Sequence, residues 1–229
     1  MKSKSKFYDR REVYKPWGYE YTIYRNLNHL AVTFLKINHN QKTSLHCHPK
    51  KKTGFIVVSG KALIQLGLWK DTARYYQAPS KLMIRTGLFH SIKAVSKTGI
   101  FALEFETPFN KKDLVRYKDD YGRQSKPYEG KYFTKKIKPH FIKFKKPKIN
   151  KKQIFRINKV NISLEIHKNF KNLINKKNST IFAVINGKVI DKYKRNVLSY
   201  GDIIKTGTLK KLSKIFKIKK YLTVIRVWK

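Results

Sequence analysis

At 229 residues, the chain is long enough for one large β domain or for two domains of roughly 100 residues each. It has 54 Lys and Arg residues against 13 Asp and Glu, a formal net charge of +41, and a single cysteine, Cys47. One cysteine excludes an internal disulfide, and no apolar run approaches the ~18 residues of a membrane span. The charged N-terminus lacks the apolar core of a signal peptide, so we expect a cytoplasmic protein that is not exported.

The positive charge predicts attraction to anions, namely nucleic acid, acidic lipid or phosphorylated substrates. Its cations are mostly Lys, Ile and Asn are also abundant, and the charge is spread along the whole chain. This pattern favours a compositional bias with a solvated basic surface, and a selected polyanion-binding surface is the alternative. We therefore expect salt-dependent adhesion to polyanions without sequence preference, because phosphate contacts alone carry no base information.

The N-terminal half of the chain is predicted to contain many short strands. Residues 1–13 are basic and indicate a frayed arm, and Pro16 and Gly18 predict an opening turn around Trp17. Strands are expected at Leu30–Ile37, Lys61–Leu66, Arg74–Gln77, Leu82–Arg85, His90–Val95 and Gly99–Glu106. We take Lys61–Leu66 as the return arm of a hairpin at Ser59 and Gly60. Without a convincing amphipathic helix, this spacing indicates an all-β barrel or sandwich.

A pair of histidines marks the stretch from Ser44 to Gly60. In a strand, His46 and His48 point to the same face, whereas Cys47 points to the other. Imidazoles placed side by side make half of a metal site, because His nitrogen suits zinc, iron, nickel and copper. Two exposed histidines on an edge strand are the alternative interpretation.

The block from Leu82 to Ala94 adds a Thr-Gly turn followed by His90. Together the two blocks resemble the two motifs of the cupin superfamily, which implies a double-stranded β-helix (jelly-roll) barrel with His46, His48 and His90 as metal ligands. Three imidazoles leave coordination positions open to substrate or water, as catalytic metal sites do. The resemblance implies a divalent metal ion, with zinc as the first choice and iron, manganese or nickel as alternatives. The sequence departs from the motifs at Thr53, Arg85 and Ala94, where a ligand Glu, a Pro and an Asn are usual.

Two further segments narrow the resemblance from the cupin superfamily to one family within it. They are KPWGYE at residues 15–20 and DLVRYKDDYGR at residues 113–123. With the histidine blocks between them, residues 14–123 resemble type II mannose-6-phosphate isomerases, a domain also fused behind mannose-1-phosphate guanylyltransferases. In that family the first ligand position is usually Gln, here His46. The resemblance implies a metal-dependent, carbohydrate-modifying enzyme. We expect a sugar-phosphate or nucleotide-sugar isomerase or epimerase, which would place it in carbohydrate metabolism or polysaccharide biosynthesis, and a homodimer.

Aldose–ketose isomerisation needs a base, and Glu104 is the catalytic candidate. Strand alternation puts Ala102, Glu104 and Glu106 on one face, with Leu103 and Phe105 on the other. The alternative for Glu104 is a structural ion pair with a nearby Lys. Candidates for binding a substrate phosphate are Arg85, Lys52 and Arg123. The alternative interpretation is that each of them is an ordinary cation on the surface.

The last third of the chain is predicted to repeat the first domain. Residues 124–152 are rich in Lys and Pro and indicate a basic connector, or alternatively a platform for single-stranded nucleic acid. Within residues 153–229, Ser179–Val189 parallels Lys52–Ala62 and Asp202–Lys210 parallels Leu82–His90. The counterparts of the three histidines and Thr53 are Leu173, Asn175, Lys210 and Thr180. The chain would thus be a bicupin whose second, degenerate barrel lacks metal ligands and has a Gly-turn hairpin at Asn186 and Gly187.

Two other functions remain open at this stage. A three-His site without a carboxylate resembles the centres of cupin dioxygenases, which would need redox-active iron or copper. A bicupin that binds sugar or polyanion without catalysis is the non-enzymatic alternative, and salt-sensitive nucleic-acid binding without sugar turnover would favour it.

Overall fold

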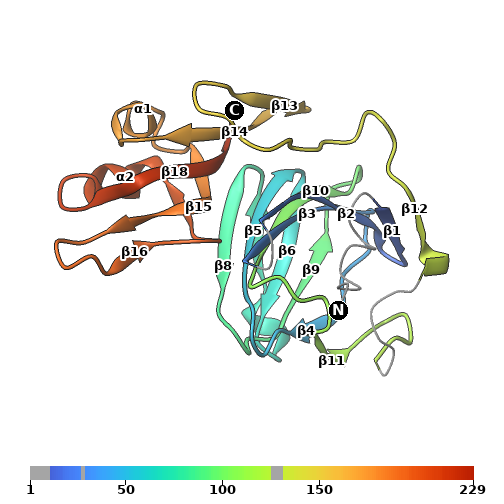
Figure 1. The fold of residues 1–229 in the computed structure, drawn as a ribbon. Helices are drawn as coiled ribbons and strands as arrows, with labels where there is room; N and C mark the ends of the chain where they lie inside the picture. Colours follow the sequence, from blue (N-terminus) through green and yellow to red (C-terminus); the bar gives the residue numbers. More distant parts are fainter. Residues whose placement is uncertain (1–10, 27–28, 125–130) are drawn as a thin grey trace, which may run out of the picture.

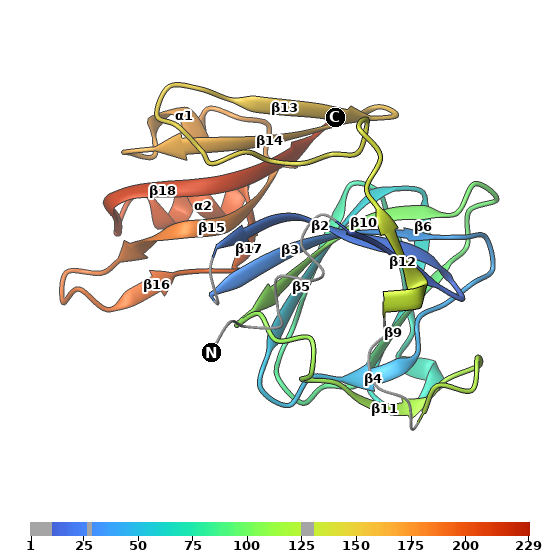
Figure 2. The same cartoon turned by 45° about the vertical axis from the view of Figure 1, so that its right-hand side comes forward.

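The computed structural model describes residues 11–26, 29–124 and 131–229 as two β-rich halves that lie side by side (Figures 1 and 2). The first half is a barrel of two facing sheets, and the second half is a single sheet with two short helices. The longest described helix has seven residues, and none of the described helices could cross a membrane. The predicted all-β class is confirmed.

The barrel closes around a core of apolar side chains that includes Trp17, Leu35, Phe55 and Ile92. Its larger sheet contains, in spatial order, β12 (Thr134–Lys136), β1 (Arg11–Lys15), β2 (Gly18–Asn26), β3 (Leu30–Ile37), β10 (Ile100–Thr107), β5 (Lys52–Ser59) and β8 (Ser80–Ile84). Its smaller sheet contains β11 (Val115–Lys118), β4 (Leu45–Cys47), β9 (His90–Ala94), β6 (Lys61–Leu66) and β7 (Arg74–Gln77). Most predicted strands are present because their alternation of apolar residues matches the period of a sheet with one face in the barrel.

The predicted hairpin at Ser59 and Gly60 is wrong. Strand β5 pairs with β8 and β10, whereas β6 pairs with β7 and β9, so the chain passes from one sheet to the other at Gly60. Gly60 has φ of +81°, and a Cβ there would lie 2.6 Å from the carbonyl oxygen of Gly99. Only glycine fits a corner with this backbone conformation and this close approach.

The connector is more ordered than its lysine and proline content predicts. Thr134–Lys136 forms β12, which pairs with β1 at the edge of the barrel. Further along, the ring of Phe141 stacks on Tyr21 with centroids 4.6 Å apart, and the side chains of Ile142 and Phe144 are buried. These apolar residues between the lysines cover part of the outer face of the larger sheet. Residues 11–13, which we assigned to the arm, likewise belong to β1.

The second half repeats the strand order of the larger sheet. It contains β13 (Gln153–Ile157), β14 (Val160–His167), β18 (Lys217–Trp228), β15 (Ile181–Ile190), β16 (Asn196–Leu198) and β17 (Ile203–Lys205). The order β13-β14-β18-β15, with β17 on β15, matches the order β2-β3-β10-β5-β8. The internal similarity in the sequence thus corresponds to a shared sheet topology.

The second half differs from a complete barrel, because among its described residues helices replace the two strands that carry histidines in the first. Leu173, the counterpart of His46, lies in α1 (Lys171–Ile174), and Lys210, the counterpart of His90, lies in α2 (Thr206–Leu212). The Gly-turn hairpin expected at Asn186 and Gly187 is also absent, since β15 continues through both residues with a shift in register. This half therefore keeps one cupin-like sheet whose outer face is covered by α1 and α2.

The two halves share one apolar core. On the barrel side, this core contains side chains from the outer face of β2, β3, β5 and β10, such as Phe105. They pack against side chains of β14, β15 and β18 and against Ile203 on the adjacent β17. Leu103 and Phe105 point outward into this core, as the alternation along β10 predicts, while Ala102 faces the barrel interior. Burial of each large side chain contributes roughly 1.5–3 kcal/mol, so the second half stabilises the barrel that it covers.

We expect Gly54→Val to weaken this shared core. A Cβ at position 54 would lie 2.6 Å from Cδ1 of Ile203 and 2.9 Å from Sδ of Met83. Forcing extra atoms into such a contact costs about 1–3 kcal/mol, which chemical denaturation would measure. Gly207→Ala is the matched control, because the nearest atoms to its Cβ are 4.0 Å away, and its stability should change by less than about 1 kcal/mol. Equal stability of Gly54→Val and the wild type would contradict close packing at β5.

Candidate metal centre and active site

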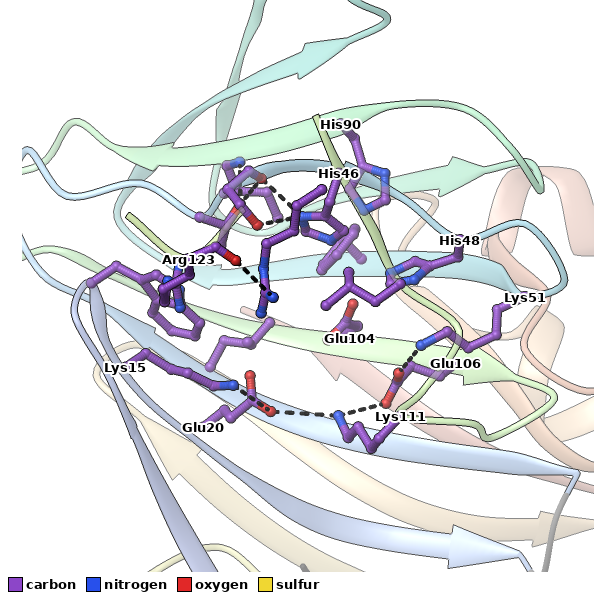
Figure 3. Close-up of a pocket in the computed structure, with 18 residues that line it drawn as sticks. Lys15, Glu20, His46, His48, Lys51, His90, Glu104, Glu106, Lys111 and Arg123 are labelled. Atoms are coloured by element: carbon purple, nitrogen blue, oxygen red, sulfur yellow. Dashed lines mark hydrogen bonds and ion pairs between the residues drawn. The ribbon is translucent and has the colours of Figure 1, made fainter. Parts of the chain in front are cut away.

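The three predicted histidines meet at one end of the barrel. His46 lies on β4 directly opposite His90 on β9, and His48 follows β4 on the same side (Figure 3). Their ring centroids are separated by 4.5 Å for His46 and His90, 5.0 Å for His46 and His48, and 5.4 Å for His48 and His90. One ligand nitrogen of each ring lies within 4.8 Å of the others. The arrangement follows from two strands that pair at this point and from the two-residue period within β4.

Backbone carbonyl groups orient each imidazole for metal binding. The Nδ1 atom of His46 lies 2.8 Å from the carbonyl oxygen of Ser44, that of His48 lies 2.6 Å from Asp113, and that of His90 lies 3.0 Å from Leu88. A ring that donates through Nδ1 keeps the lone pair on Nε2. The Nε2 atoms of His48 and His90 are buried and have no hydrogen-bond partner among the described residues. Unpaired buried nitrogen atoms that converge in this way fit a divalent metal ion.

The environment keeps these histidines neutral, as metal ligands must be. Burial, with repulsion from His90 and His48, lowers the pKa of His46 well below its ordinary value. Burial, with the positive charge of Lys51, lowers the pKa of His48 to about 3. Burial also lowers the pKa of His90 to about 4. Free histidine has a pKa near 6.5 and would predict that the site loses its metal below about pH 6, and the lowered pKa values move this expected loss to lower pH.

We expect the metal-free protein to lose stability as the pH falls below about 6.5. In the unfolded chain each imidazole gains a proton near its ordinary pKa of 6.5, whereas folded His90 stays neutral until its pKa of about 4. Each such histidine lowers the free energy of unfolding by about 1.4 kcal/mol per pH unit in this window. Glu104 opposes this trend, because its raised pKa stabilises the folded state as the pH falls from about 8 towards 4.5, but it is one group against three.

Denaturation of the metal-free protein between about pH 7 and about pH 5 measures this effect. The dependence on pH should be shallower in the His90→Gln variant, which removes one of the titrating groups. A free energy of unfolding that is constant across this range would contradict the burial of neutral imidazoles.

The position where the cupin motif has a carboxylate ligand is occupied by Thr53. Its side chain is 1% exposed, and its hydroxyl oxygen has no hydrogen-bond partner among the described residues. Two residues earlier in the chain, the ammonium group of Lys51 is paired with Glu106 at 2.6 Å. The site is therefore a three-imidazole set with a paired lysine close by.

An ion-pair chain forms the floor of the pocket (Figure 3). It runs from Lys15 to Glu20 (3.8 Å), from Glu20 to Lys111 (3.5 Å), from Lys111 to Glu106 (2.9 Å) and from Glu106 to Lys51 (2.6 Å). All five side chains are at most 13% exposed, so water screens these charges weakly. Although burial opposes it, Lys111 and Lys51 lower the pKa of Glu106.

Most members of the ion-pair chain were not identified from the sequence. Lys51 lies two residues from Thr53, so strand alternation could have placed it on the pocket side. Lys111 and Asp113 lie in the loop between β10 and β11, whose path no periodicity predicts. Asp113 braces the site, since its carboxylate accepts the backbone N–H groups of Lys50 and Lys51 at 3.0 and 2.8 Å.

Glu104 lies in the same pocket but stays outside the ion-pair chain. It projects from β10 towards the histidines, and among the described residues it makes no hydrogen bond or ion pair (Figure 3). Burial and repulsion from Glu106 raise the pKa of Glu104 to about 8. The structural ion pair that was the alternative for Glu104 is made by Glu106 instead. Glu104 therefore has the environment of a general acid or base that works near neutral pH.

The three predicted phosphate-binding cations occupy different places. Arg123 lines the pocket, and its guanidinium binds Asp119 through Nη2 at 2.6 Å and Nε at 3.1 Å. Lys52 points away from the pocket and pairs at 2.7 Å with Asp202 of the second half. Arg85 is exposed in the turn before His90 and does not line the pocket. Lys15, Lys51, Lys111 and Arg116 are the additional pocket cations that the structure identifies.

The comparisons with known structures show only distant likeness. CapF, a capsular polysaccharide assembling protein from Staphylococcus aureus, is 17% identical with a TM-score of 0.42, covering 47% of this chain and 34% of its own. KdgF from Halomonas sp. is 14% identical (TM-score 0.38; 42% of this chain, 84% of its own). A Klebsiella pneumoniae protein with a double-stranded β-helix domain is 16% identical (TM-score 0.39; 44% and 84%). The chain thus spans about a third of the length of CapF. No curated protein matches the sequence.

The sequence itself matches a family over the region that builds this site. The matching family is described as Mannose-6-phosphate isomerase C-terminal, and the match covers residues 2–119, just over half of the chain. This segment includes His46, His48, His90 and Glu104. The chain therefore belongs to the Mannose-6-phosphate isomerase C-terminal family, as the resemblance of its motifs implied.

Proposed function

We propose that the first half is a metal-dependent enzyme that isomerises or epimerises a phosphorylated sugar or a nucleotide sugar. The observation that carries this proposal is the isolated position of Glu104. It is a carboxyl group without an ion-pair partner among the described residues, in a pocket that also contains three convergent imidazoles and several cations.

The proposed reaction is a proton transfer, between adjacent carbon atoms of the sugar in an isomerisation or between the two faces of one carbon in an epimerisation. In an isomerisation, ionised Glu104 takes the proton from one carbon and returns it to the neighbouring carbon, while the proton of the hydroxyl group passes to the former carbonyl oxygen. Its pKa of about 8 makes it a strong enough base and still leaves part of it ionised near neutral pH. His46, His48 and His90 would hold a divalent metal ion, which would polarise the carbonyl and hydroxyl oxygen atoms of the substrate.

The charge of the pocket supports an anionic substrate. Its lining contains the cations Lys15, Lys51, Lys111, Arg116 and Arg123 against the carboxylates of Glu20, Glu104 and Glu106. Cations therefore exceed carboxylates even when all three glutamates are ionised. In a buried site this excess favours a phosphate group, and Arg side chains bind phosphate through a planar fork.

We expect the loop at residues 119–123, which contributes Arg123 to the lining, to move outward when a sugar binds. In its present position the cavity has a volume of about 70 Å³, which suits an ion and a few water molecules. The loop is held by the hydroxyl group of Tyr121, which donates to Gln41 at 2.8 Å, and by an ion pair of Asp120 with Lys42. The ion pair is partly exposed and contributes at most about 1 kcal/mol to holding the loop in place.

Two measurements test the proposal. Elemental analysis of the purified protein should detect about one divalent metal ion per chain, and chromatography should detect isomers or epimers after incubation with a panel of phosphosugars and nucleotide sugars. No conversion of any of them by the metal-loaded protein would contradict the assignment.

The alternatives make different predictions for the same samples. A dioxygenase would contain iron or copper and consume oxygen, and the absence of a carboxylate ligand at Thr53 is the feature that favours it. A sugar- or polyanion-binding protein would bind without turnover.

We also propose a cytoplasmic location, supported by the free thiol of Cys47. Homodimer formation and salt-dependent adhesion to polyanions stay predictions, which molecular mass in solution and binding to DNA at several salt concentrations would test.

A further inference from the structure

A cleft opens where the core shared by the two halves ends. On β15 this core includes Ile181, Ala183 and Ile185, and the pairing of β15 with β18 shifts in register around Asn186 and Gly187, directly after these residues. A cleft of about 590 Å³, lined in part by Asn186, lies between β2, the connector and the sheet of the second half. Its volume is within the range of ligand sites, which often occur between domains. It shares no lining residue with the pocket of the histidines.

A row of side chains on the sheet of the second half points into this cleft. Thr223 on β18 pairs with Ile166 on one side and Asn186 on the other, so the three side chains share a face. Thr223 is 1% exposed, and its hydroxyl group has no hydrogen-bond partner among the described residues. Leaving a buried hydroxyl unpaired costs about 1–3 kcal/mol, and a bound ligand with hydroxyl groups would remove that cost.

Tyrosine side chains lie beside the row, and two of them bond the amide group of Asn186. The amide nitrogen of Asn186 donates to the hydroxyl of Tyr221 at 3.3 Å, and the hydroxyl of Tyr200 donates to the amide oxygen of Asn186 at 3.3 Å. Tyr24 lines the barrel side of the cleft, and Tyr221 is 38% exposed at its edge. Such rings offer a flat apolar face together with a polar tip, and they stack on the apolar face of a sugar ring.

Two cations complete the lining. Arg25 lies on the barrel side, where its guanidinium stacks over the ring of Phe109 at 4.5 Å, and Lys146 is an exposed residue of the connector. Among the residues that the structure describes, no Asp or Glu lines the cleft. Its lining therefore combines aromatic faces, hydroxyl and amide groups, and positive charge.

We propose that this cleft is a second binding site, separate from the histidine pocket, for an anionic saccharide that carries carboxylate or phosphate groups. The tyrosine rings contact the sugar ring, Thr223 and Asn186 bond its hydroxyl groups, and Arg25 and Lys146 bind its negative charge. The site exists only because the degenerate half packs against the barrel, which gives the second half a function although it lacks the metal ligands.

Isothermal titration calorimetry with tetragalacturonate tests the proposal, with neutral maltotetraose as the comparison ligand at about 150 mM salt. Tetragalacturonate should bind, and maltotetraose should bind at least about tenfold more weakly. Tyr221→Ala and Lys146→Ala should each weaken binding by about tenfold. Tyr193→Ala and Lys148→Ala are matched controls, because these exposed residues lie outside the cleft, and they should bind as the wild type does.

Thr223→Val separates binding from folding. Valine has nearly the same shape as threonine, so the variant should be at least as stable as the wild type in thermal melting, yet it should bind tetragalacturonate more weakly. His90→Ala should bind it normally, which distinguishes this site from the proposed enzyme. Absence of binding, equal binding by Tyr221→Ala and Thr223→Val, or loss of binding only in His90→Ala would overturn the proposal. Binding of a short single-stranded oligonucleotide at these residues in place of the saccharide would overturn it too.

Discussion

Replacing His90 by alanine should remove most of the bound metal from the purified protein. His90 supplies one of three convergent nitrogen atoms, and its Nε2 is buried without a partner among the described residues. Loss of an orienting group around a metal ligand typically lowers affinity 10–100-fold, so loss of a ligand itself should cost at least about 100-fold. His46→Ala should have the same effect. Elemental analysis after dialysis against a weak chelator would measure the metal content.

The matched control for this experiment is His39→Ala. The ring of His39 is on the surface and bonds the backbone carbonyl of Ser96 at 3.0 Å, and it takes no part in the cluster. We expect its metal content to equal that of the wild type, and the same holds for His29, His140 and His167. Full metal content in His90→Ala, with a folded protein by circular dichroism, would show that the three rings do not form the site.

The second large effect is expected for Glu104→Gln, which should nearly abolish turnover while the metal stays bound. Glutamine keeps the size of the side chain but cannot accept the proton, and a positioned base contributes about 10²–10⁴-fold to such reactions. In the wild type, activity should rise as the pH increases through about 8, because the pKa of Glu104 is raised to that value and only the ionised form acts as a base. This rise should disappear in the variant.

Glu106→Gln serves as the comparison two residues away on the same face. Glu106 bonds both Lys51 and Lys111, so its loss removes the carboxylate that pairs with buried Lys51 and one of the two carboxylates that pair with Lys111. Breaking a buried pair costs about 3–5 kcal/mol, and we expect a lower melting temperature as the main effect. Wild-type turnover by Glu104→Gln, or loss of its metal, would assign the proton transfer to another group.

Strand periodicity in the sequence determined much of the barrel and of the histidine site. The run Leu30–Ile37 became β3 with the predicted bounds, because its β-branched and aromatic residues suit a strand that is buried on both faces. The spacing of His46 and His48 placed both rings on one side of β4, and alternation along β10 separated Glu104 from Phe105. These are local properties, since a period of two determines the face of each residue without knowledge of its neighbours.

Only the tertiary structure decided which cations face the pocket and which segments of the second half form helices in place of strands. Lys51 and Lys52 are adjacent and chemically identical, yet one pairs with Glu106 in the pocket and the other with Asp202 of the second half. Sequence similarity likewise aligned Gly207 with Gly87, but Gly87 has φ of +73° in a turn, whereas Gly207 lies in α2. In both cases residues distant in the sequence set the outcome, because pairing and packing across the chain, and not the local pattern, determine the path of the backbone and the partner of each charge.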